Sequence, residues 1–410
     1  MWELIRANKR NSIILMVIMA AVLLLMGFVI GMVMFGPEGG LFGLMIAMVI
    51  WLIMTLVSFS SGDQILLAAS KATRVTHDVH PQLFNVVEEM KIAAGLPAMP
   101  KVYIINDPAP NAFATGRNPS RASVAVTAGL LGRLNRDELQ GVIAHEMSHI
   151  VNRDILFVTL AGVMLGSIVL ISQVFLRGMF YSSMMGSRRR YSSGSGGGGG
   201  GQIVMLVVAI VVAILAPIMA YLLYFALSRR REYLADAGAA RLTRYPEGLA
   251  SALEKIVGDP SPQLAAVNKV TAPMYIANPF KKKKQRKLSD LTSTHPPISE
   301  RIKILRNMTQ GASFKEYSKA YTNITHAASV VPIAAVSNKE DIALRQAGAE
   351  AKKKDRRENQ MRQVGDIMRK VNQFVFLSCV CGLKMKIPPN FKGNKVKCPR
   401  CRKTLDVASK

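Results

Sequence analysis

Four long stretches without a charged residue constrain this chain more than any other feature of its 410 residues. They are Ser12–Phe35, Leu41–Ser60, Ile155–Leu176 and Ile203–Leu227, with 24, 20, 22 and 25 residues. A helix of about 20 apolar residues crosses the ~30 Å hydrocarbon core of a membrane. The first stretch is too long for a cleaved signal peptide, and a second follows it at once. The sequence therefore predicts an integral membrane protein with four spans.

The basic residues of the short loops predict how the spans are oriented, because such loops stay cytoplasmic. Arg6, Lys9 and Arg10 precede the first span, whereas the loop after it carries only Glu38. This places the N-terminus, the segment between the second and third spans, and everything after the fourth span in the cytoplasm, at the inner membrane. The basic loop Arg177–Gln202 opposes this orientation. Either the rule is overridden there, or the second hairpin does not cross completely.

A metal-binding pattern lies just before the third span, where residues 145–149 read H-E-M-S-H. Asn135 and Glu138 form the pattern of a capping box, and apolar residues recur at helical spacing from 137 to 152. On a helix, positions i and i+4 share a face about 6 Å apart, so two imidazoles can bind one metal ion. Glu146 can then act as general base toward a water. The alternative is a buried helix that carries two histidines by chance.

A catalytic zinc site needs a third protein ligand and an open position. The segment Ser228–Ala237 follows the fourth span without Gly or Pro and is predicted to be helical. Glu232 and Asp236 lie four residues apart, hence on one face of that helix. Glu232 can be the third ligand, and Asp236 can orient a ligating histidine. Taken alone, this pattern is more typical of a solvated face that pairs with Arg229–Arg231.

Taken in order, these motifs resemble the HtpX-type membrane zinc metalloproteases, and the resemblance covers about residues 1–308. An H-E-x-x-H helix, a membrane hairpin and an S-R-x-R-E-Y-x-A-D-A segment follow one another. Further matching segments are Asn111–Arg117, Val124–Leu131, Asn152–Asp154, Thr294–Pro297 and Glu300–Ile302.

The resemblance implies roles for individual residues. His145, His149 and Glu232 would bind zinc. Glu146 would be the general base and later the proton donor, and Asp236 would support a ligand.

Two further roles rest on the same resemblance. His295 would stabilise the oxyanion of the tetrahedral intermediate, although a histidine before two prolines is equally expected in a plain loop or helix start. A sheet-edge strand would bind the substrate backbone by strand addition, which grips an extended peptide without reading its sequence. The alternative is an ordinary strand. The residues of this strand are Asn111, Ala112, Phe113 and Ala114.

The chain is strongly basic, with 53 Lys and Arg against 26 Asp and Glu, a net charge of +27. Residues 281–287 form a block of six basic residues around one Gln. Such a block is a solvated loop, a contact to anionic membrane lipid or a nucleic-acid contact. The block has no interleaved aromatic residue, which makes nucleic acid the least favoured of the three.

All four cysteines lie near the C-terminus, as a C-x-C pair and a C-P-x-C pair. Paired cysteines at this separation predict a zinc ribbon in which four thiolates hold a structural Zn²⁺. Two disulfides are the alternative, which the predicted cytoplasmic location disfavours. The module offers a surface for a protein partner. The predicted ligands are Cys379, Cys381, Cys398 and Cys401.

The sequence thus predicts an α+β protein: four membrane helices, a zincin-like, mostly helical catalytic domain with a small sheet, and a small zinc ribbon. The predicted function is a membrane-embedded zinc endopeptidase. The resemblance implies substrates among misfolded or damaged membrane proteins. The predicted segments are a membrane hairpin (1–62), two catalytic parts (63–154 and 228–335) flanking a second hairpin (155–227), a charged tether (336–373) and the ribbon (374–410).

Two other classes of function remain open. A catalytically silent zinc scaffold that recruits partners through the ribbon would not need Glu146. A membrane transporter would be expected to carry ionisable residues inside its spans, and the four stretches contain none.

Overall fold

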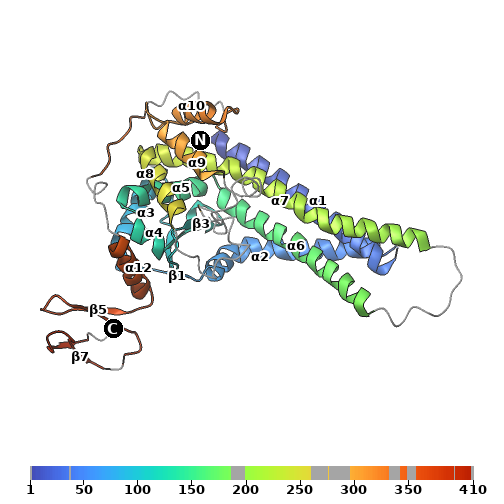
Figure 1. Cartoon of the computed structure of the whole chain (residues 1–410). Helices are drawn as coiled ribbons and strands as arrows, with labels where there is room; N and C mark the ends of the chain where they lie inside the picture. Colours follow the sequence, from blue (N-terminus) through green and yellow to red (C-terminus); the bar gives the residue numbers. More distant parts are fainter. Residues whose placement is uncertain are drawn as a thin grey trace.

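The computed structural model describes residues 2–36, 38–185, 199–259, 276, 296–331, 342–348, 357–391 and 393–407. Long helices project from a domain that contains a small sheet, and a separate pair of hairpins lies near the C-terminus (Figure 1). The α-helices are α1 (Trp2–Phe35), α2 (Gly39–Ala69), α3 (Pro81–Ala94), α4 (Ala128–Arg133), α5 (Arg136–Val151), α6 (Asp154–Met185), α7 (Gly199–Thr243), α8 (Pro246–Gly258), α9 (Ile298–Arg306), α10 (Phe314–Thr325) and α12 (Arg357–Val371).

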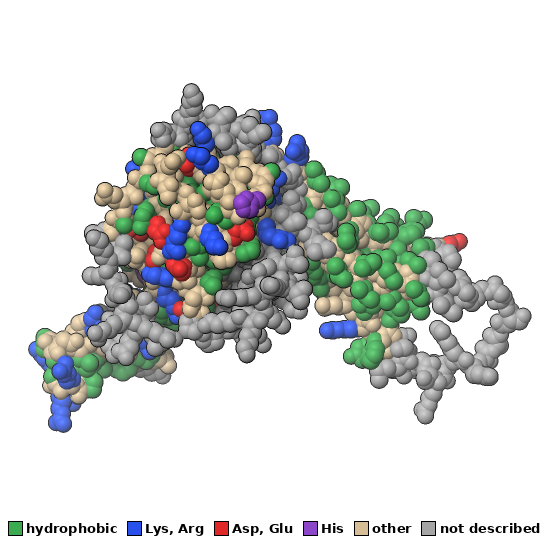
Figure 2. All heavy atoms as spheres, turned by 45° about the horizontal axis from the view of Figure 1, so that its top comes forward, with side chains coloured by type: hydrophobic (Ala, Val, Ile, Leu, Met, Phe, Trp, Pro, Cys, Tyr) green, Lys and Arg blue, Asp and Glu red, His purple; other side chains and the backbone are tan. Residues whose placement is uncertain are grey.

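The projecting helices α1, α2, α6 and α7 form the membrane part. Among the described residues, three windows are long and apolar enough to cross a membrane: Ile13–Phe35, Gly39–Ala69 and Met164–Tyr181. In α7 the apolar part whose side chains are described is Leu206–Tyr221, and the helix continues unbroken through Pro217. Hydrophobic side chains gather on the surface of these helices, whereas charged side chains lie over the domain (Figure 2). Three of the four predicted spans thus have the length and composition to cross.

The sheet of the domain is small and mixed. Its strands are β1 (Ala72–Arg74), β2 (Lys101–Ile105), β3 (Ala112–Gly116) and β4 (Ala122–Thr127), in the order β1-β2-β4-β3. The β2–β4 pair is parallel and the other two pairs are antiparallel. All residues of β3 and β4 are buried, because helices cover the sheet. The strand order places β3 at one edge of the sheet, and β3 contacts α5.

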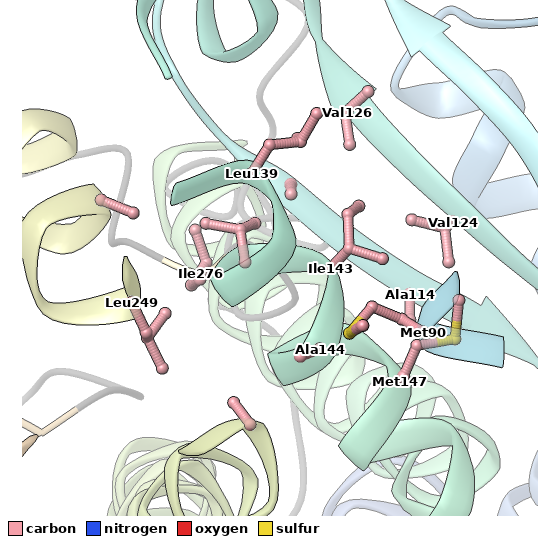
Figure 3. Close-up of a cluster of buried hydrophobic side chains, with 14 of the residues drawn as sticks. Met90, Ala114, Val124, Val126, Leu139, Ile143, Ala144, Met147, Leu249 and Ile276 are labelled. Atoms are coloured by element: carbon pink, nitrogen blue, oxygen red, sulfur yellow. The ribbon is translucent and has the colours of Figure 1, made fainter. Parts of the chain in front are cut away.

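The main core lies between this sheet and helix α5. Leu139, Ile143 and Met147 recur on one face of α5 and pack against Val124 and Val126 of β4 (Figure 3). These side chains are nearly or fully inaccessible to solvent. Burying one such side chain stabilises the fold by about 1.5–3 kcal/mol. The apolar period of α5 thus fixes which face meets the sheet, and the opposite face is left for polar groups.

The C-terminal module consists of two short antiparallel hairpins. Strand β5 (Val375–Ser378) pairs with β6 (Lys384–Ile387), and β7 (Lys395–Lys397) pairs with β8 (Thr404–Asp406). Helix α12 precedes them and packs against α4 of the domain.

Candidate functional site

Helix α5 carries the H-E-x-x-H residues and begins where the sequence predicts. The Asn135 side chain accepts from the amide of Glu138 at 2.9 Å, and the Glu138 carboxylate accepts from the amide of Asn135 at 2.9 Å. This reciprocal cap satisfies two amides that the helix itself leaves unpaired. It also sets the rotation of the first turn, and through it the direction in which the two histidines point.

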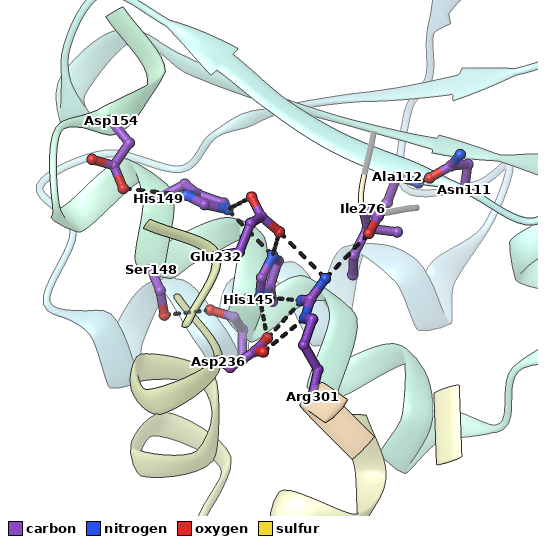
Figure 4. A network of polar contacts seen from close by, with 11 residues as sticks. Asn111, Ala112, His145, Ser148, His149, Asp154, Glu232, Asp236, Ile276 and Arg301 are labelled. Carbon is purple, nitrogen blue, oxygen red and sulfur yellow. Dashed lines mark hydrogen bonds and ion pairs between the residues drawn. The ribbon is translucent and has the colours of Figure 1, made fainter. Parts of the chain in front are cut away.

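Three side chains from two helices converge (Figure 4). The Nε2 atoms of His145 and His149 lie 3.2 Å apart. Each Nε2 lies 3.5 Å from a carboxylate oxygen of Glu232 on α7. With Zn–N distances of about 2.0–2.1 Å, two ligand atoms of a tetrahedral zinc lie about 3.4 Å apart. The three side chains therefore have the spacing that one zinc ion requires.

Close packing of α5 and α7 makes this convergence possible. Gly238 of α7 faces Ser148 of α5, and a Cβ at this position would lie 2.9 Å from the Cβ of Ser148 and closer still to its hydroxyl. That hydroxyl donates to the carbonyl of Ala144 at 2.8 Å, within its own helix. The crossing therefore requires glycine, and it lies between the ligands of one helix and the ligand of the other.

A carboxylate orients each imidazole through its other nitrogen. His145 Nδ1 lies 3.0 Å from Asp236, and His149 Nδ1 lies 3.2 Å from Asp154. A hydrogen bond at Nδ1 fixes the tautomer in which Nε2 carries the lone pair for a metal. Asp236 thus lies where the sequence analysis predicts it. The partner of His149 was missed, although Asp154 ends the Asn152–Asp154 segment that carries the resemblance.

Arg301 of α9 is the second residue that the sequence analysis assigned no role. It is fully buried and donates to both oxygens of Asp236, at 2.7 and 2.6 Å. Its Nη1 lies 3.3 Å from Glu232, and it also donates to the carbonyl of Ile276 at 3.4 Å. Arg301 follows the Pro-Pro motif in sequence, and that position was the available signal. Arg301 thus contacts both Glu232, the predicted third metal ligand, and Asp236, the carboxylate that orients His145.

The charges of the centre favour a divalent cation. Buried charges are costly unless they are paired. Among the described residues, four buried carboxylates face two buried guanidinium groups here, so that, with neutral histidines, this set lacks two positive charges. A zinc ion would supply both. The groups are Glu146, Asp154, Glu232 and Asp236, with Arg231 and Arg301.

The protonation of the central groups reflects this excess of carboxylates. Burial lowers the pKa of His145 and His149, but the neighbouring carboxylates outweigh burial and raise both pKa values above the usual one. Burial also raises the pKa of Glu146, and the hydrogen bond from the backbone of Ala114 only partly offsets this. A metal ion would therefore compete with protons for the two imidazoles up to a higher pH than at free histidine.

The outer edge of β3, the side not paired with β4, runs past Glu146. Since backbone groups alternate along a strand, Ala112 and Ala114 present theirs to the same side. The backbone of Ala114 hydrogen-bonds to Glu146, and the carbonyl of Ala112 accepts from the amide of Ile276 at 3.0 Å. The edge can thus pair with extended backbone immediately beside α5, the helix of His145 and His149, and Ile276 already pairs with it.

The other two residues of the predicted substrate strand have structural contacts. Asn111 precedes β3, and its amide donates to Thr127 at 2.8 Å while its carbonyl accepts from the amide of Thr127 at 2.9 Å. Phe113 is buried on the opposite face of the sheet, against Leu67 of α2. These two residues hold the edge strand in place rather than facing the metal ligands.

Two sequence features lie outside the described residues. They are His295 and the basic block 281–287.

The four cysteine sulfurs of the C-terminal module also converge. All four lie within 4.8 Å of one another. Cys379 and Cys401 are 3.3 Å apart, and Cys381 and Cys398 are 3.6 Å apart. Ligands of a tetrahedral Zn–S₄ centre lie about 3.8 Å apart, given Zn–S distances near 2.3 Å. The backbone amide of Cys401 hydrogen-bonds to Cys398 and lowers the pKa of that thiol to about 6, which favours the thiolate that binds metal.

Known proteins share most of this chain. The profile of peptidase family M48 matches residues 77–309. A protein described as "Protease HtpX homolog" from Dictyoglomus thermophilum is 46% identical over 307 residues, covering 75% of this chain and 94% of the relative. Its counterpart in Listeria monocytogenes is 46% identical over 309 residues, covering 75% and 100%. Among solved structures, Ste24p of S. mikatae overlaps with a TM-score of 0.40 at 18% identity, covering 74% of this chain and 67% of that one. That overlap is too low to carry an argument about the fold.

Proposed function

This chain belongs to peptidase family M48 and is a membrane zinc endopeptidase of the HtpX type, and on that basis we propose which of its residues bind zinc and catalyse the reaction. His145, His149 and Glu232 hold the catalytic zinc. The observation that carries this assignment is that their ligand atoms lie within 4.8 Å of one another. Asp236 and Asp154 keep the two imidazoles in the metal-binding tautomer, and Arg301 fixes Asp236.

Glu146 moves the proton in the proposed mechanism. A zinc ion held by His145, His149 and Glu232 would supply Lewis-acid chemistry, polarising the scissile carbonyl and lowering the pKa of a water molecule to about 7. Glu146 accepts the proton of the attacking water and later gives it to the leaving nitrogen. Its pKa, raised by burial, suits a group that must hold a proton briefly and then release it. His295 is the proposed donor to the oxyanion.

The substrate would bind as an added strand on the outer edge of β3, in the place where Ile276 pairs with Ala112. Ala112 and Ala114 would supply the backbone groups. Asn111 and Phe113 hold the strand in place through their contacts with Thr127 and Leu67. Because this edge passes the helix that carries Glu146, a peptide paired to it would present a carbonyl to the general base. Backbone pairing is independent of side chains, which suits an enzyme that acts on unfolded polypeptide.

The proposed substrates are misfolded or damaged membrane proteins. The charge-free stretch Ile155–Leu176 begins directly after Asp154, and the stretch Ile203–Leu227 ends five residues before Glu232, about 7.5 Å along a helix, so the site would lie close to the membrane surface. The proposed orientation is the one that the N-terminal basic residues favour. The catalytic domain and the ribbon would then face the cytoplasm from an inner membrane.

The C-terminal module holds a second, structural zinc through its four cysteines. A module this small buries too little apolar surface to fold without metal. Four thiolate ligands leave no open position for catalysis. A protein is the proposed partner of its surface, and membrane lipid is the proposed contact of the basic block 281–287.

Glu146→Gln provides the test of the catalytic assignment. The variant and wild type are loaded with zinc to the same content and incubated in detergent with an unfolded membrane protein. We expect wild type to cleave and Glu146→Gln to bind zinc without cleaving. Glu88→Gln, on the exposed face of α3, is the matched control and should cleave normally. If wild type binds zinc at this site and cleaves nothing, the scaffold alternative is favoured.

A further inference from the structure

A segment beyond the family match contacts the catalytic domain. We call residues 342–348 the strap; they follow the last residue matched by the M48 profile by more than thirty positions. The carbonyl of Ile342, the first residue of the strap, accepts a hydrogen bond from the amide of Ala312 at 2.9 Å. Further along, the amide of Arg345 donates to the carbonyl of Arg244 at 2.8 Å. The strap is therefore docked on the domain through its own backbone.

The side chain of Arg345 joins two helices. Its guanidinium donates to Asp137 at 2.9 Å and to Gln140 at 2.7 Å, both on α5. Its Nε donates to the carbonyl of Thr243 at 3.1 Å, at the C-terminal end of α7. The same group lies 5.0 Å from the ring centre of Tyr245, within the range of a cation–π contact. All three guanidinium nitrogens therefore donate hydrogen bonds, and the planar group also contacts an aromatic ring.

The domain contributes a matching acceptor. Asp137 is nearly buried, and both of its oxygens accept from the strap, one from Arg345 and one from the amide of Gly348 at 2.7 Å. A Cβ at position 348 would lie 3.0 Å from that carboxylate, so the close approach favours glycine. A carboxylate removed from water needs such donors. The pairing with a buried carboxylate shows that the strap makes specific contacts with the domain.

The two joined helices are the ones that carry the metal ligands. Asp137 precedes His145 by eight residues on α5, about 12 Å along the helix. Thr243 follows Glu232 by eleven residues on α7, about 16 Å along the helix. At their other ends, α5 and α7 are connected through α6 and the membrane part. The strap thus joins these helices at the end remote from α6, where α8, which follows α7, also packs against α5.

We propose that Arg345 is a positioning residue of the peptidase: by holding the ends of α5 and α7 together, it fixes the separation of the histidine pair from Glu232. The inference rests on the metal site proposed above. Since α12 and the ribbon follow the strap, it also makes the C-terminal extension part of the catalytic unit.

The test uses full-length protein loaded with Co²⁺, because thiolate charge-transfer absorption reports the ribbon separately from the His/Glu site. Arg345→Ala, Arg345→Lys and the control Arg369→Ala are compared for metal release to a chelator, kcat, KM and Tm. Arg369 belongs to the same extension, and among the described residues its ion pair lies within α12, with Asp366. We expect Arg345→Ala to accelerate metal release from the His/Glu site about 3- to 30-fold and to lower kcat more than it raises KM. Arg345→Lys should fall in between, and Arg369→Ala should match wild type.

A double variant with Asp137→Asn separates positioning from general stability. Because both substitutions break the same contact, their effects on metal release should be less than additive. The inference is overturned if Arg345→Ala lowers Tm while metal release and kcat stay at wild-type values. If wild type itself takes up no metal on His145, His149 and Glu232, the proposed function falls and this inference with it.

Discussion

At the scale of single residues, the centre is defined by what surrounds its ligands. The H-E-x-x-H spacing and Glu232 could be predicted because each is a local helical pattern. Asp154 and Arg301 could not, since no local pattern tells which distant side chain will meet an imidazole or a carboxylate. Both residues lie within segments that the resemblance had marked. The sequence thus located these segments, and only the three-dimensional contacts gave these two residues a role.

Asp154→Asn should weaken zinc binding without removing a ligand. The substitution keeps the shape of the side chain but takes away the charge that holds His149 at 3.2 Å. Losing such an outer partner typically costs about 10- to 100-fold in metal affinity. Competition with a chelator of known affinity measures this, with Asp78→Asn, in an exposed turn, as control. Unchanged affinity would exclude a role for Asp154 in orienting the ligand.

Zinc binding should release protons near neutral pH. The folded-state pKa values of His145 and His149 lie above the usual value, so both imidazoles retain protons to a higher pH than free histidine. Since only the neutral imidazole binds metal, affinity should rise with pH until it passes these pKa values, and then level off. Calorimetry in buffers of different ionisation enthalpy counts the protons released. A binding heat that is independent of the buffer at pH 7 would contradict this expectation.

At the scale of elements, the sequence predicts helices better than it predicts their crossings. The capping box and apolar period of α5 are properties of neighbouring residues, and both are confirmed. The fourth span is less clear, because its described apolar part is only Leu206–Tyr221. The contact between α5 and α7 depends on Gly238 and Ser148, which are ninety residues apart. No local pattern pairs them.

Gly238→Ala should push α5 and α7 apart. The added methyl would lie 2.9 Å from the Cβ of Ser148, and overpacking of this kind costs about 1–3 kcal/mol. We expect a lower Tm and weaker zinc binding together, because the displaced helix carries Glu232.

Gly258→Ala is the matched control, since a Cβ there meets no atom within 4 Å. Combining Gly238→Ala with Ser148→Gly should restore zinc affinity in part. If Gly238→Ala lowers stability while zinc affinity is retained, the crossing does not set the geometry of the ligands.

At the scale of the whole molecule, the chain combines a peptidase with an extension that the Listeria monocytogenes relative lacks. The Listeria monocytogenes relative is matched over its full length by 75% of this chain, so a quarter of the chain has no counterpart there. The sequence predicts the ribbon because cysteine spacing is a local signal. The docking of the strap was not predicted, since a charged stretch gives no indication of the surface it will meet.

The full-length protein should bind two zinc ions with separable determinants. We expect Cys398→Ser to leave one zinc and an intact peptidase site, and His145→Ala to leave one zinc in the ribbon. The physical reason is that the two ligand sets share no residue and lie in separate parts of the fold. Metal analysis of purified protein measures the content. A single substitution that removes both ions would mean that the two sites fold as one unit.

The chain order of the ligands has a consequence for biosynthesis. Glu232 follows His149 by 83 positions, and the segment between them includes the predicted second membrane hairpin. At about 5–20 residues per second, a ribosome needs roughly 4–17 s to pass from one to the other. A nascent chain therefore has an incomplete site while its own hairpin is being inserted. The protease gains its third ligand only after this vulnerable segment has been made, and Arg301 and Arg345 emerge later still.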